Sequence, residues 1–360
     1  MSFIARCFRV LVALTFVAVC LAGNVTTNLA GKVTSNGWYI PTPGTTFYWQ
    51  ISDPNLGTSH KEKIFDVDGF GVSVNTITWL KSMGKKVFCY FSFGTAEDYR
   101  SDYKDFPRST LGGLGCMNED CSETWPGERW LDVKSSAVRQ ILEKRIQLAK
   151  RKGCDGIEPD NVMAYSSNIM VKPISRFTIT AKDQFNFNTW IANTVHRYGM
   201  SVGLKNPGAL APSYMANLFD WALVESCNYF SDWSSDPWYS GKYQCDYSNE
   251  FIIRNKAVFS VEYKELWGTS PGTVNSIQFP QALCADNNAR GFMTRLYDAD
   301  LGVGPSYSFA NCMLHKPAGC NVWKECIKLQ VYNQYKQQGM ARWDAVGQCV
   351  RARRAACRYA

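Results

Sequence analysis

The feature that most limits the possible folds is a recurrence of short apolar runs between longer amphipathic stretches. The runs, rich in Val, Ile and aromatic residues, cover 46–51, 63–67, 86–91, 155–158, 201–205, 221–225, 257–262 and 291–296. Helical spacing of apolar residues covers 75–83, 135–152, 182–198, 212–219 and 276–288. Eight strands alternating with helices predict an α/β fold, a (β/α)8 TIM barrel. Two separate βαβ lobes would give the same local pattern and are the alternative.

The two ends of the chain differ from this repeating segment. An apolar run over 10–22 follows Arg6 and Arg9, which predicts a cleaved secretory signal at 1–23, with an uncleaved anchor as the alternative. We expect the barrel to cover 24–304. Residues 305–360 are rich in Cys, Lys and Arg and predict a small, disulfide-stapled helical extension.

Cysteine usage favours an oxidising compartment. Without Cys7 and Cys20, twelve of the 14 cysteines remain, an even number that suits disulfides. Cys89 lies within a predicted strand, where a buried thiol or a bridge, with Cys154 as a candidate partner, is favoured over a nucleophile. We therefore expect a secreted, extracellular monomer with no membrane attachment after signal cleavage.

Several function classes are disfavoured by charge and by missing motifs. The formal charge of +8 falls to +6 without Arg6 and Arg9 and is not clustered, so we expect no nucleic acid partner. The three histidines are scattered and no CxxC or HExxH spacing occurs, so we expect no metal. No GxSxG, GxGxxG or GxxxxGK[ST] sequence is present, and we expect no cofactor.

Carboxylates at strand ends are the remaining candidates for chemistry. The densest group lies in 155–161 (DGIEPDN), and Glu225 ends a strand two positions later in the predicted barrel. Cleaving a glycosidic bond needs two carboxyl groups, one to protonate the leaving oxygen and one to act as nucleophile or base. We predict Asp160 as nucleophile and Glu225 as general acid/base. Lys205, on the strand between them, would keep at least one carboxylate ionised.

Further polar and aromatic residues are expected around this pair. Glu158 has an ion pair with Lys205 as its alternative role, and ion pairs at the barrel mouth are the alternative for three other acids (Asp66, Asp68 and Glu262). The long segment 94–134 after the third strand predicts a lid or groove wall. The predicted substrate-binding residues are Asp66, Asp68, Tyr90, Glu158, Asn161, Lys205, Tyr229 and Glu262.

Several sequence blocks together resemble glycoside hydrolase family 114, the endo-α-1,4-polygalactosaminidases. They are 46–50 (TFYWQ), 87–92 (VFCYFS) with Gly94, 128–133 (ERWLDV), 153–162 (GCDGIEPDNV), 203–206 (GLKN), 224–227 (VESC) and 262–263 (EY), within a match from about 38 to 298. The resemblance implies a secreted barrel enzyme that hydrolyses an α-1,4-linked galactosamine polymer, a cationic amino-sugar polysaccharide. It also implies that the family's catalytic acids correspond to Asp160 and Glu225.

Two other functions stay open at this point. One is a non-catalytic, secreted glycan-binding barrel, and the other is a glycosidase of the same mechanism that acts on a different amino-sugar polymer. A carboxyl separation of about 5 to 5.5 Å would support a retaining enzyme, and about 6.5 to 9.5 Å an inverting one.

Overall fold

The computed structural model describes most of the predicted barrel. The described residues are 32–33, 37–53, 56, 61–116, 124–165, 177–208, 210–227, 244–263, 287 and 290–297. The predicted signal, the extension at 305–360, Tyr229 and nearly all of the predicted helix 276–288 lie outside these ranges, so these predictions and the domain boundaries stay predictions. Among the described helices, none combines the length and the apolar character that crossing a bilayer requires.

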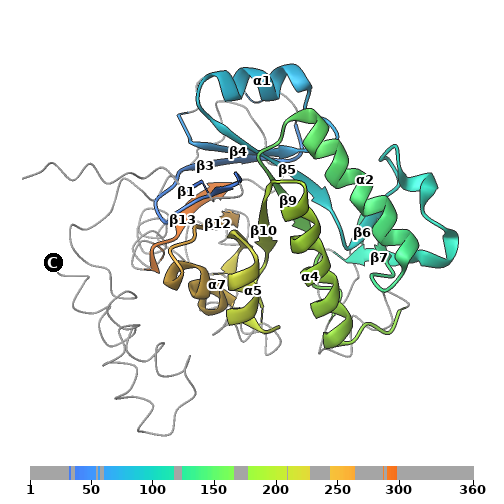
Figure 1. Cartoon of the computed structure of the whole chain (residues 1–360). Helices are drawn as coiled ribbons and strands as arrows, with labels where there is room; N and C mark the ends of the chain where they lie inside the picture. The colour runs from blue at the N-terminus through green and yellow to red at the C-terminus, as the bar shows by residue number, and fades with distance from the viewer. Residues whose placement is uncertain are drawn as a thin grey trace, which may run out of the picture.

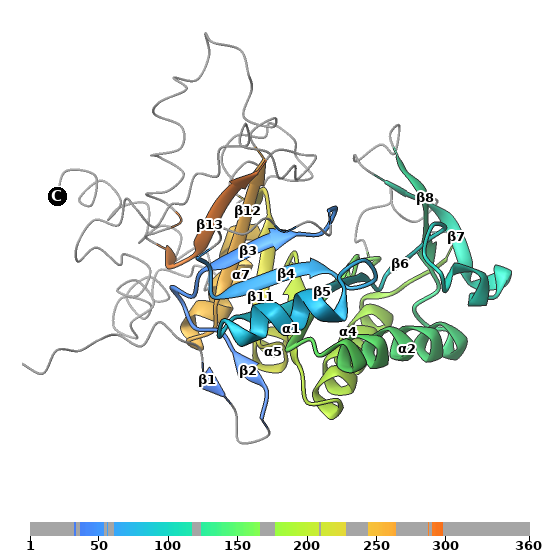
Figure 2. The ribbon, with the colours of Figure 1, turned by 90° about the horizontal axis from the view of Figure 1, so that it is seen from above.

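Eight parallel strands form the central sheet, and they match the eight predicted runs. Their order, β13-β12-β11-β10-β9-β5-β4-β3, keeps neighbours in the sequence order of the barrel strands. Figures 1 and 2 show the strands curving around a common interior. The predicted (β/α)8 barrel is confirmed. The strands are β3 (Phe47–Gln50), β4 (Ile64–Asp68), β5 (Lys86–Ser92), β9 (Gly156–Asp160), β10 (Ser201–Lys205), β11 (Trp221–Glu225), β12 (Val258–Tyr263) and β13 (Met293–Tyr297).

Helices cover the outer face of this sheet (Figure 1). They are α1 (Val74–Ser82), α2 (Ser136–Lys152), α4 (Ala181–Arg197), α5 (Pro212–Leu218) and α7 (Gln244–Ile253). The first four match predicted helices. In α2, Val138, Ile141 and Leu142 lie on its buried face, and Gly153 ends the helix in the left-handed region at φ 93°. The sequence analysis missed α7, because its apolar residues are few and lie among polar ones.

The barrel is closed between its first and last strands by side chains. The Trp49 backbone N–H donates to the Tyr297 hydroxyl at 3.0 Å, and the two rings meet edge to face. Arg295 donates to the Phe47 carbonyl oxygen at 2.7 Å. These contacts bring together residues almost 250 positions apart, so β3 and β13 lie side by side.

Alternation along the strands separates two apolar cores. On β5, Val87, Cys89 and Phe91 face the helices and belong to the larger core. Phe88 faces inward and stacks on Trp221 with ring centroids 4.7 Å apart. The inner core consists of Tyr39, Phe47, Trp49, Ile64, Phe88, Trp221, Leu223, Ala257, Phe259, Val261, Met293 and Tyr297.

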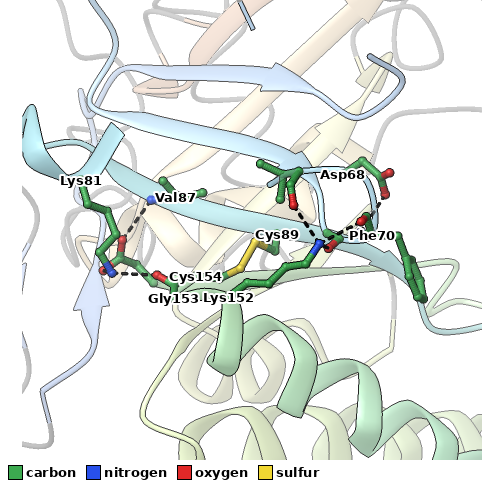
Figure 3. Close-up of a disulfide and its surroundings, with 11 residues drawn as sticks. Asp68, Phe70, Lys81, Val87, Cys89, Lys152, Gly153 and Cys154 are labelled. Atoms are coloured by element: carbon green, nitrogen blue, oxygen red, sulfur yellow. Dashed lines mark hydrogen bonds and ion pairs between the residues drawn. A yellow bond between two sulfur atoms is a disulfide. The ribbon is translucent and has the colours of Figure 1, made fainter. Parts of the chain in front are cut away.

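A disulfide fastens the predicted strand-three cysteine to the start of β9. The Cys89–Cys154 bridge confirms the candidate pairing, and Figure 3 shows it beside Lys152. The Lys152 ammonium donates to the carbonyl oxygens of Gly69, Phe70 and Val72, each at 2.8 Å, and so binds the loop after β4 to the end of α2. A second bridge, Cys227–Cys245, joins the end of β11 to α7.

The segment 94–134 forms a small antiparallel sheet of its own. It contains β6 (Thr95–Glu97), β7 (Leu111–Cys116) and β8 (Thr124–Leu131), with β8 in the middle. We call β6, β7 and β8 the rim sheet. It follows directly on β5 and therefore lies at the carboxyl edge of the barrel, to one side in both views (Figures 1 and 2). A short pair, β1 (Lys32–Val33) with β2 (Tyr39–Ile40), precedes the barrel.

Candidate active site

The Lys205 ammonium, at the carboxyl end of β10, is the centre of the candidate site. Its Nζ lies 3.3 Å from Asp160 Oδ2 and 3.1 Å from Glu225 Oε2, and it donates to Glu158 Oε1 at 3.0 Å. Burial disfavours the charged ammonium, but these three carboxyl groups outweigh it and raise the pKa of Lys205 well above its usual value. Lys205 is therefore a fixed positive charge between β9 and β11.

Glu225 is held by three donors. The Tyr263 hydroxyl donates to Oε1 at 2.6 Å, and Asn206 Nδ2 donates to Oε2 at 3.1 Å. Asn206 also accepts from the Glu225 backbone N–H at 2.9 Å, so its amide binds both the main chain and the side chain of Glu225. Burial alone would raise the pKa of Glu225, but Lys205, Tyr263 and Asn206 together lower it below its usual value. The Glu225 carboxyl is thus a fixed carboxylate at neutral pH.

Asp160 is oriented in a similar way at the end of β9. The Tyr90 hydroxyl donates to Oδ2 at 3.2 Å, and the Asn161 backbone N–H donates to Oδ1 at 2.7 Å. Burial and the nearby acids raise the pKa of Tyr90 well above its usual value, so Tyr90 stays a neutral donor. Asp160 and Glu225 retain exposed fractions of 17% and 24% in their side chains, whereas Lys205 has 2%. The two carboxylates can therefore reach solvent while the cation between them cannot.

The backbone turns sharply after each of these three strand ends. Asn161, Asn206 and Ser226 directly follow Asp160, Lys205 and Glu225, and have φ values of 58°, 46° and 51°. The left-handed region disfavours residues with a Cβ atom, and such strained positions concentrate at functional sites. The strain here ends each strand so that the preceding side chain points into the mouth.

Below the two partly exposed carboxylates lies a sealed group of polar residues. Glu158 is fully buried and accepts from Lys205 and from Trp49 Nε1, the latter at 2.8 Å. It thus forms the ion pair with Lys205 that was the alternative to a sugar contact. Burial, together with the neighbouring Glu158, raises the pKa of Asp66 well above its usual value, which favours the neutral form of this carboxyl group.

Comparison with known proteins assigns the chain to a family. The model of glycoside-hydrolase family GH114 matches residues 27–315. The chain belongs to this family. It is similar in structure to Ega3 from Aspergillus fumigatus, solved in complex with galactosamine, with 32% sequence identity and a TM-score of 0.61 over 77% of this chain and 100% of that chain.

A second solved structure supports the fold alone. The glycoside hydrolase domain of PelA from Pseudomonas aeruginosa is 13% identical, with a TM-score of 0.52 over 73% of this chain and 96% of that domain. No match was found among curated protein sequences. The family membership shows that the chain is a glycosidase, and the site described above lies at the mouth of its barrel.

Two of the predicted site residues, Asp68 and Glu262, do not join the group around Lys205. Asp68 pairs with Arg100 at 2.9 Å and accepts from the Gly71 backbone N–H, also at 2.9 Å. Glu262 is fully buried on the strand face opposite to that of Val261 and Tyr263, which belong to the inner side. Tyr229 lies outside the described residues. A contact of any of these three with a sugar stays a prediction, and the positions of Asp68 and Glu262 give it no support.

The predicted set of site residues left out three residues that the structure brings to the site, although all three lie in blocks that carry the family resemblance. Tyr263 adjoins the predicted Glu262, and the alternation of β12 makes it the inward residue of the two. Asn206 ends β10 in a left-handed turn, and Trp49 comes from the first barrel strand. A polar residue directly after a strand-end lysine was the signal available for Asn206. Nothing local distinguishes Tyr263 or Trp49 from the many other aromatic residues.

Within the described part of the chain, no group of three or more His, Cys, Asp or Glu side chains has the arrangement of a metal site. The cation that holds the three carboxyl groups together is the Lys205 ammonium. What the arrangement offers chemically is two oriented, partly exposed carboxylates beside neutral phenol donors.

Proposed function

We propose that the protein is a secreted glycosidase that cleaves a galactosamine-containing, α-1,4-linked polysaccharide, with Asp160 and Glu225 as the reacting carboxyl groups. The observation that carries the proposal is that both groups meet the same ammonium, Lys205 Nζ, at 3.3 and 3.1 Å, although 65 residues separate them in the sequence. Both are oriented by donors and both reach solvent. A glycan-binding protein without activity would have no need of this paired arrangement.

The spacing of the two carboxyl groups is compatible with a retaining reaction. Asp160 Oδ2 lies 3.3 Å and Glu225 Oε2 3.1 Å from Lys205 Nζ, so the two oxygens are no farther apart than these distances combined. This bound on the two nearest oxygens is compatible with the roughly 5 to 5.5 Å between the carboxyl groups of retaining enzymes, and it excludes only the widest separations of inverting ones. A retaining enzyme forms a covalent bond between one carboxylate and the sugar, which water then breaks while the other carboxyl group acts as base.

Charge supports a cationic substrate. Around Lys205 lie Asp160, Glu225 and Glu158, so carboxyl groups outnumber the single ammonium in this part of the mouth. A polymer of galactosamine without acetyl groups carries an ammonium on each sugar and is attracted to such a surface. The complex of the similar Ega3 with galactosamine is consistent with this substrate class.

The test is hydrolysis of defined oligomers by the wild type and two amide variants. Oligomers rich in galactosamine should be shortened, and Asp160→Asn and Glu225→Gln should each lower kcat by about 10² to 10⁴-fold with unchanged circular dichroism. Glu143→Gln, at a partly exposed carboxyl group on α2 that pairs with Arg197, is the matched control. Shortening of glucosamine-rich oligomers alone would indicate a different amino-sugar polymer, and shortening of neither would contradict the proposal.

The roles of the two carboxyl groups are separable by chemical rescue. From the sequence we assign the nucleophile to Asp160 and the acid/base to Glu225, but the lowered pKa of Glu225 favours the exchanged roles, because a general acid must carry a proton before it reacts. With alanine at the nucleophile position, azide attacks the sugar directly and gives a glycosyl azide of inverted configuration. With alanine at the acid/base position, azide attacks the covalent intermediate and the configuration is retained. Asp160→Ala should therefore give the inverted azide and Glu225→Ala the retained one, and the opposite result would exchange the roles.

Secretion is supported by the disulfides and by the predicted signal at 1–23. Cys89–Cys154 and Cys227–Cys245 are bridges of the kind that persist outside the cytosol. Expression in a secreting host should give protein in the medium whose first residue lies close after residue 23. Retention of the full chain in the membrane fraction would instead support an uncleaved anchor.

A further inference from the structure

The rim sheet reaches the Asp160 carboxylate through one side chain, that of Glu128. Glu128 lies on β8, opposite Glu97 of β6, and its Oε1 accepts from Asn161 Nδ2 at 2.9 Å. The same Oε1 accepts a short hydrogen bond from the Thr95 hydroxyl. Asn161 directly follows Asp160, and its backbone N–H binds Asp160 Oδ1 at 2.7 Å. Two hydrogen bonds therefore lead from Glu128 to the proposed reacting group.

The side-chain amide of Asn161 contacts three hydrogen-bond acceptors. Besides Glu128 Oε1, Nδ2 donates to Ser92 Oγ and Thr95 Oγ1, each at 3.1 Å. Ser92 ends β5 and Thr95 begins β6, so barrel and rim sheet both contribute. Because Asn161 has a φ of 58°, its backbone needs contacts that hold it in the left-handed region. The contacts of the side-chain amide keep the Asn161 backbone in this conformation. Glu128 is the one of these three acceptors that can carry a negative charge.

The main chain around Asn161 is packed equally closely. The N–H groups of Phe93 and Gly94 both donate to the Asp160 carbonyl oxygen, at 2.9 and 3.1 Å, and the Leu131 N–H at the end of β8 donates to the Gly94 carbonyl at 2.8 Å. A Cβ atom on Gly94 would lie 1.7 Å from the Asn161 carbonyl oxygen. The start of the rim sheet thus fits directly against the turn that follows Asp160.

We propose that Glu128 is a positioning residue for the Asp160 carboxylate, acting from the rim sheet through the Asn161 amide. Its counterpart across the mouth is Asn206, which holds Glu225 from the neighbouring strand β10. The two carboxylates are thus oriented by different layers of the molecule, one by the rim sheet and one by the barrel itself. The inference rests on the proposed function in one respect, that Asp160 reacts with the substrate.

The strength of the hydrogen bond from Asn161 to Glu128 should depend on pH, because Glu128 titrates near neutral pH. Burial, together with Asp160 and Glu97, raises the pKa of Glu128 to about 7, although Thr95 and Arg100 act in the opposite direction. A charged acceptor binds the Asn161 amide more strongly than a neutral one. The hold on Asn161 therefore strengthens as the pH rises through about 7. The titratable and charged groups that face Glu128 are Asp160, Glu97, Arg100, Tyr90 and Tyr99.

The test compares Glu128→Ala and Glu128→Gln with the wild type. Removing the acceptor should lower kcat by about 10- to 100-fold and change KM little, because a misplacement of about 1 Å costs about 100-fold. The amide of Glu128→Gln keeps an oxygen for Asn161 and Thr95 and should restore most of kcat. Glu143→Ala, on α2 and bonded to Tyr198, is the matched control and should match the wild type. Wild-type kcat in Glu128→Ala would overturn the proposal.

The pH profile separates positioning from a merely structural role. The ratio of wild-type kcat to that of Glu128→Gln should be near one at a pH well below 7, where Glu128 is neutral. At a pH well above 7, where Glu128 is charged, the ratio should be greater than one. A constant ratio would overturn the pH-dependent hold. This measurement uses only the amide variant, so it stands even where Glu128→Ala fails to fold.

Crystal structures of the Glu128 variants without substrate test the position of Asp160 directly. This test does not depend on whether the protein is active. In Glu128→Ala the 2.7 Å contact from Asn161 N to Asp160 Oδ1 should be lengthened or lost, whereas Glu128→Gln, which keeps an acceptor oxygen, should retain it. An unchanged contact in Glu128→Ala would overturn the inference. An inactive wild type with a displaced Asp160 in Glu128→Ala would contradict the proposed function alone.

Discussion

The two ends of the barrel interior have opposite chemistry, although the same strands build both. At the amino end Phe88 stacks on Trp221, and Phe47 packs against Phe259 with ring centroids 4.6 Å apart. At the carboxyl end Lys205 lies among carboxyl groups. A Cβ on Gly203 would lie 2.5 Å from the Trp221 ring, so glycine makes the room for the aromatic layer. The amino end stabilises the fold, and the carboxyl end contains buried charges that are stable only as a complete set.

The largest effect should follow from removing the cation of the mouth. Lys205→Met leaves the fully buried Glu158 without its ion pair, which should cost about 3 to 5 kcal/mol in unfolding free energy and abolish measurable hydrolysis. Adding Glu158→Gln should recover most of the stability and none of the activity. Chemical denaturation and oligomer hydrolysis measure the two effects. Equal stability of the single and double variants would show that the charges at the mouth are independent.

A substitution at the amino end should affect stability and leave the chemistry intact. Trp221→Ala should lower the unfolding free energy by about 3 to 5 kcal/mol through the cavity it creates. The remaining folded fraction should retain wild-type kcat. Trp79→Ala, on α1 with 41% of its surface exposed, is the control and should change stability much less. A large loss of kcat in correctly folded Trp221→Ala would show that the two ends are coupled.

The two disulfides should differ modestly in their contribution to stability. Cys89–Cys154 closes a segment of 65 residues and Cys227–Cys245 one of 18. The chain-entropy argument gives about 4 kcal/mol for the first and about 3 kcal/mol for the second. Double alanine variants of each pair, compared by thermal and urea unfolding, measure the difference. A larger loss from the shorter loop would mean that the second bridge fixes α7 against β11 by more than chain entropy.

The smallest expected effect concerns acid stability at the mouth. Since the pKa of Glu225 is lowered in the folded protein, its charge stabilises the fold above the usual value of 4.5, and this contribution is lost as the pH falls through the lowered pKa. The difference in unfolding free energy between the wild type and Glu225→Gln should therefore shrink as the pH falls from neutral into that range. If the difference in unfolding free energy between the wild type and Glu225→Gln did not change with pH, Lys205 would not be the cause of a lowered Glu225 pKa.

Much of the barrel was predictable because its signals are local. The eight runs carry Val, Ile and aromatic residues that suit strands buried on both faces, and each matched strand differs from its run by two residues or fewer at either end. The rim sheet was less predictable. Gly112, Gly113 and Gly115 interrupt the apolar pattern of β7, so sequence patterning indicated a loop there. The helix α7 was missed for a similar reason, because its buried face includes polar residues such as Ser248 and Asn249.

The sequence by itself determined the barrel, the carboxylates at strand ends and the candidate Cys89–Cys154 bridge, since each depends on residues within one run or on cysteines in adjacent elements. The tertiary structure alone decided which of those polar residues meet. Tyr263 rather than Glu262 reaches Glu225, and Glu128 reaches Asn161 from another sheet. The physical reason is that the face of a strand residue depends on register and barrel closure. These are fixed by contacts such as Trp49 with Tyr297, almost 250 residues apart.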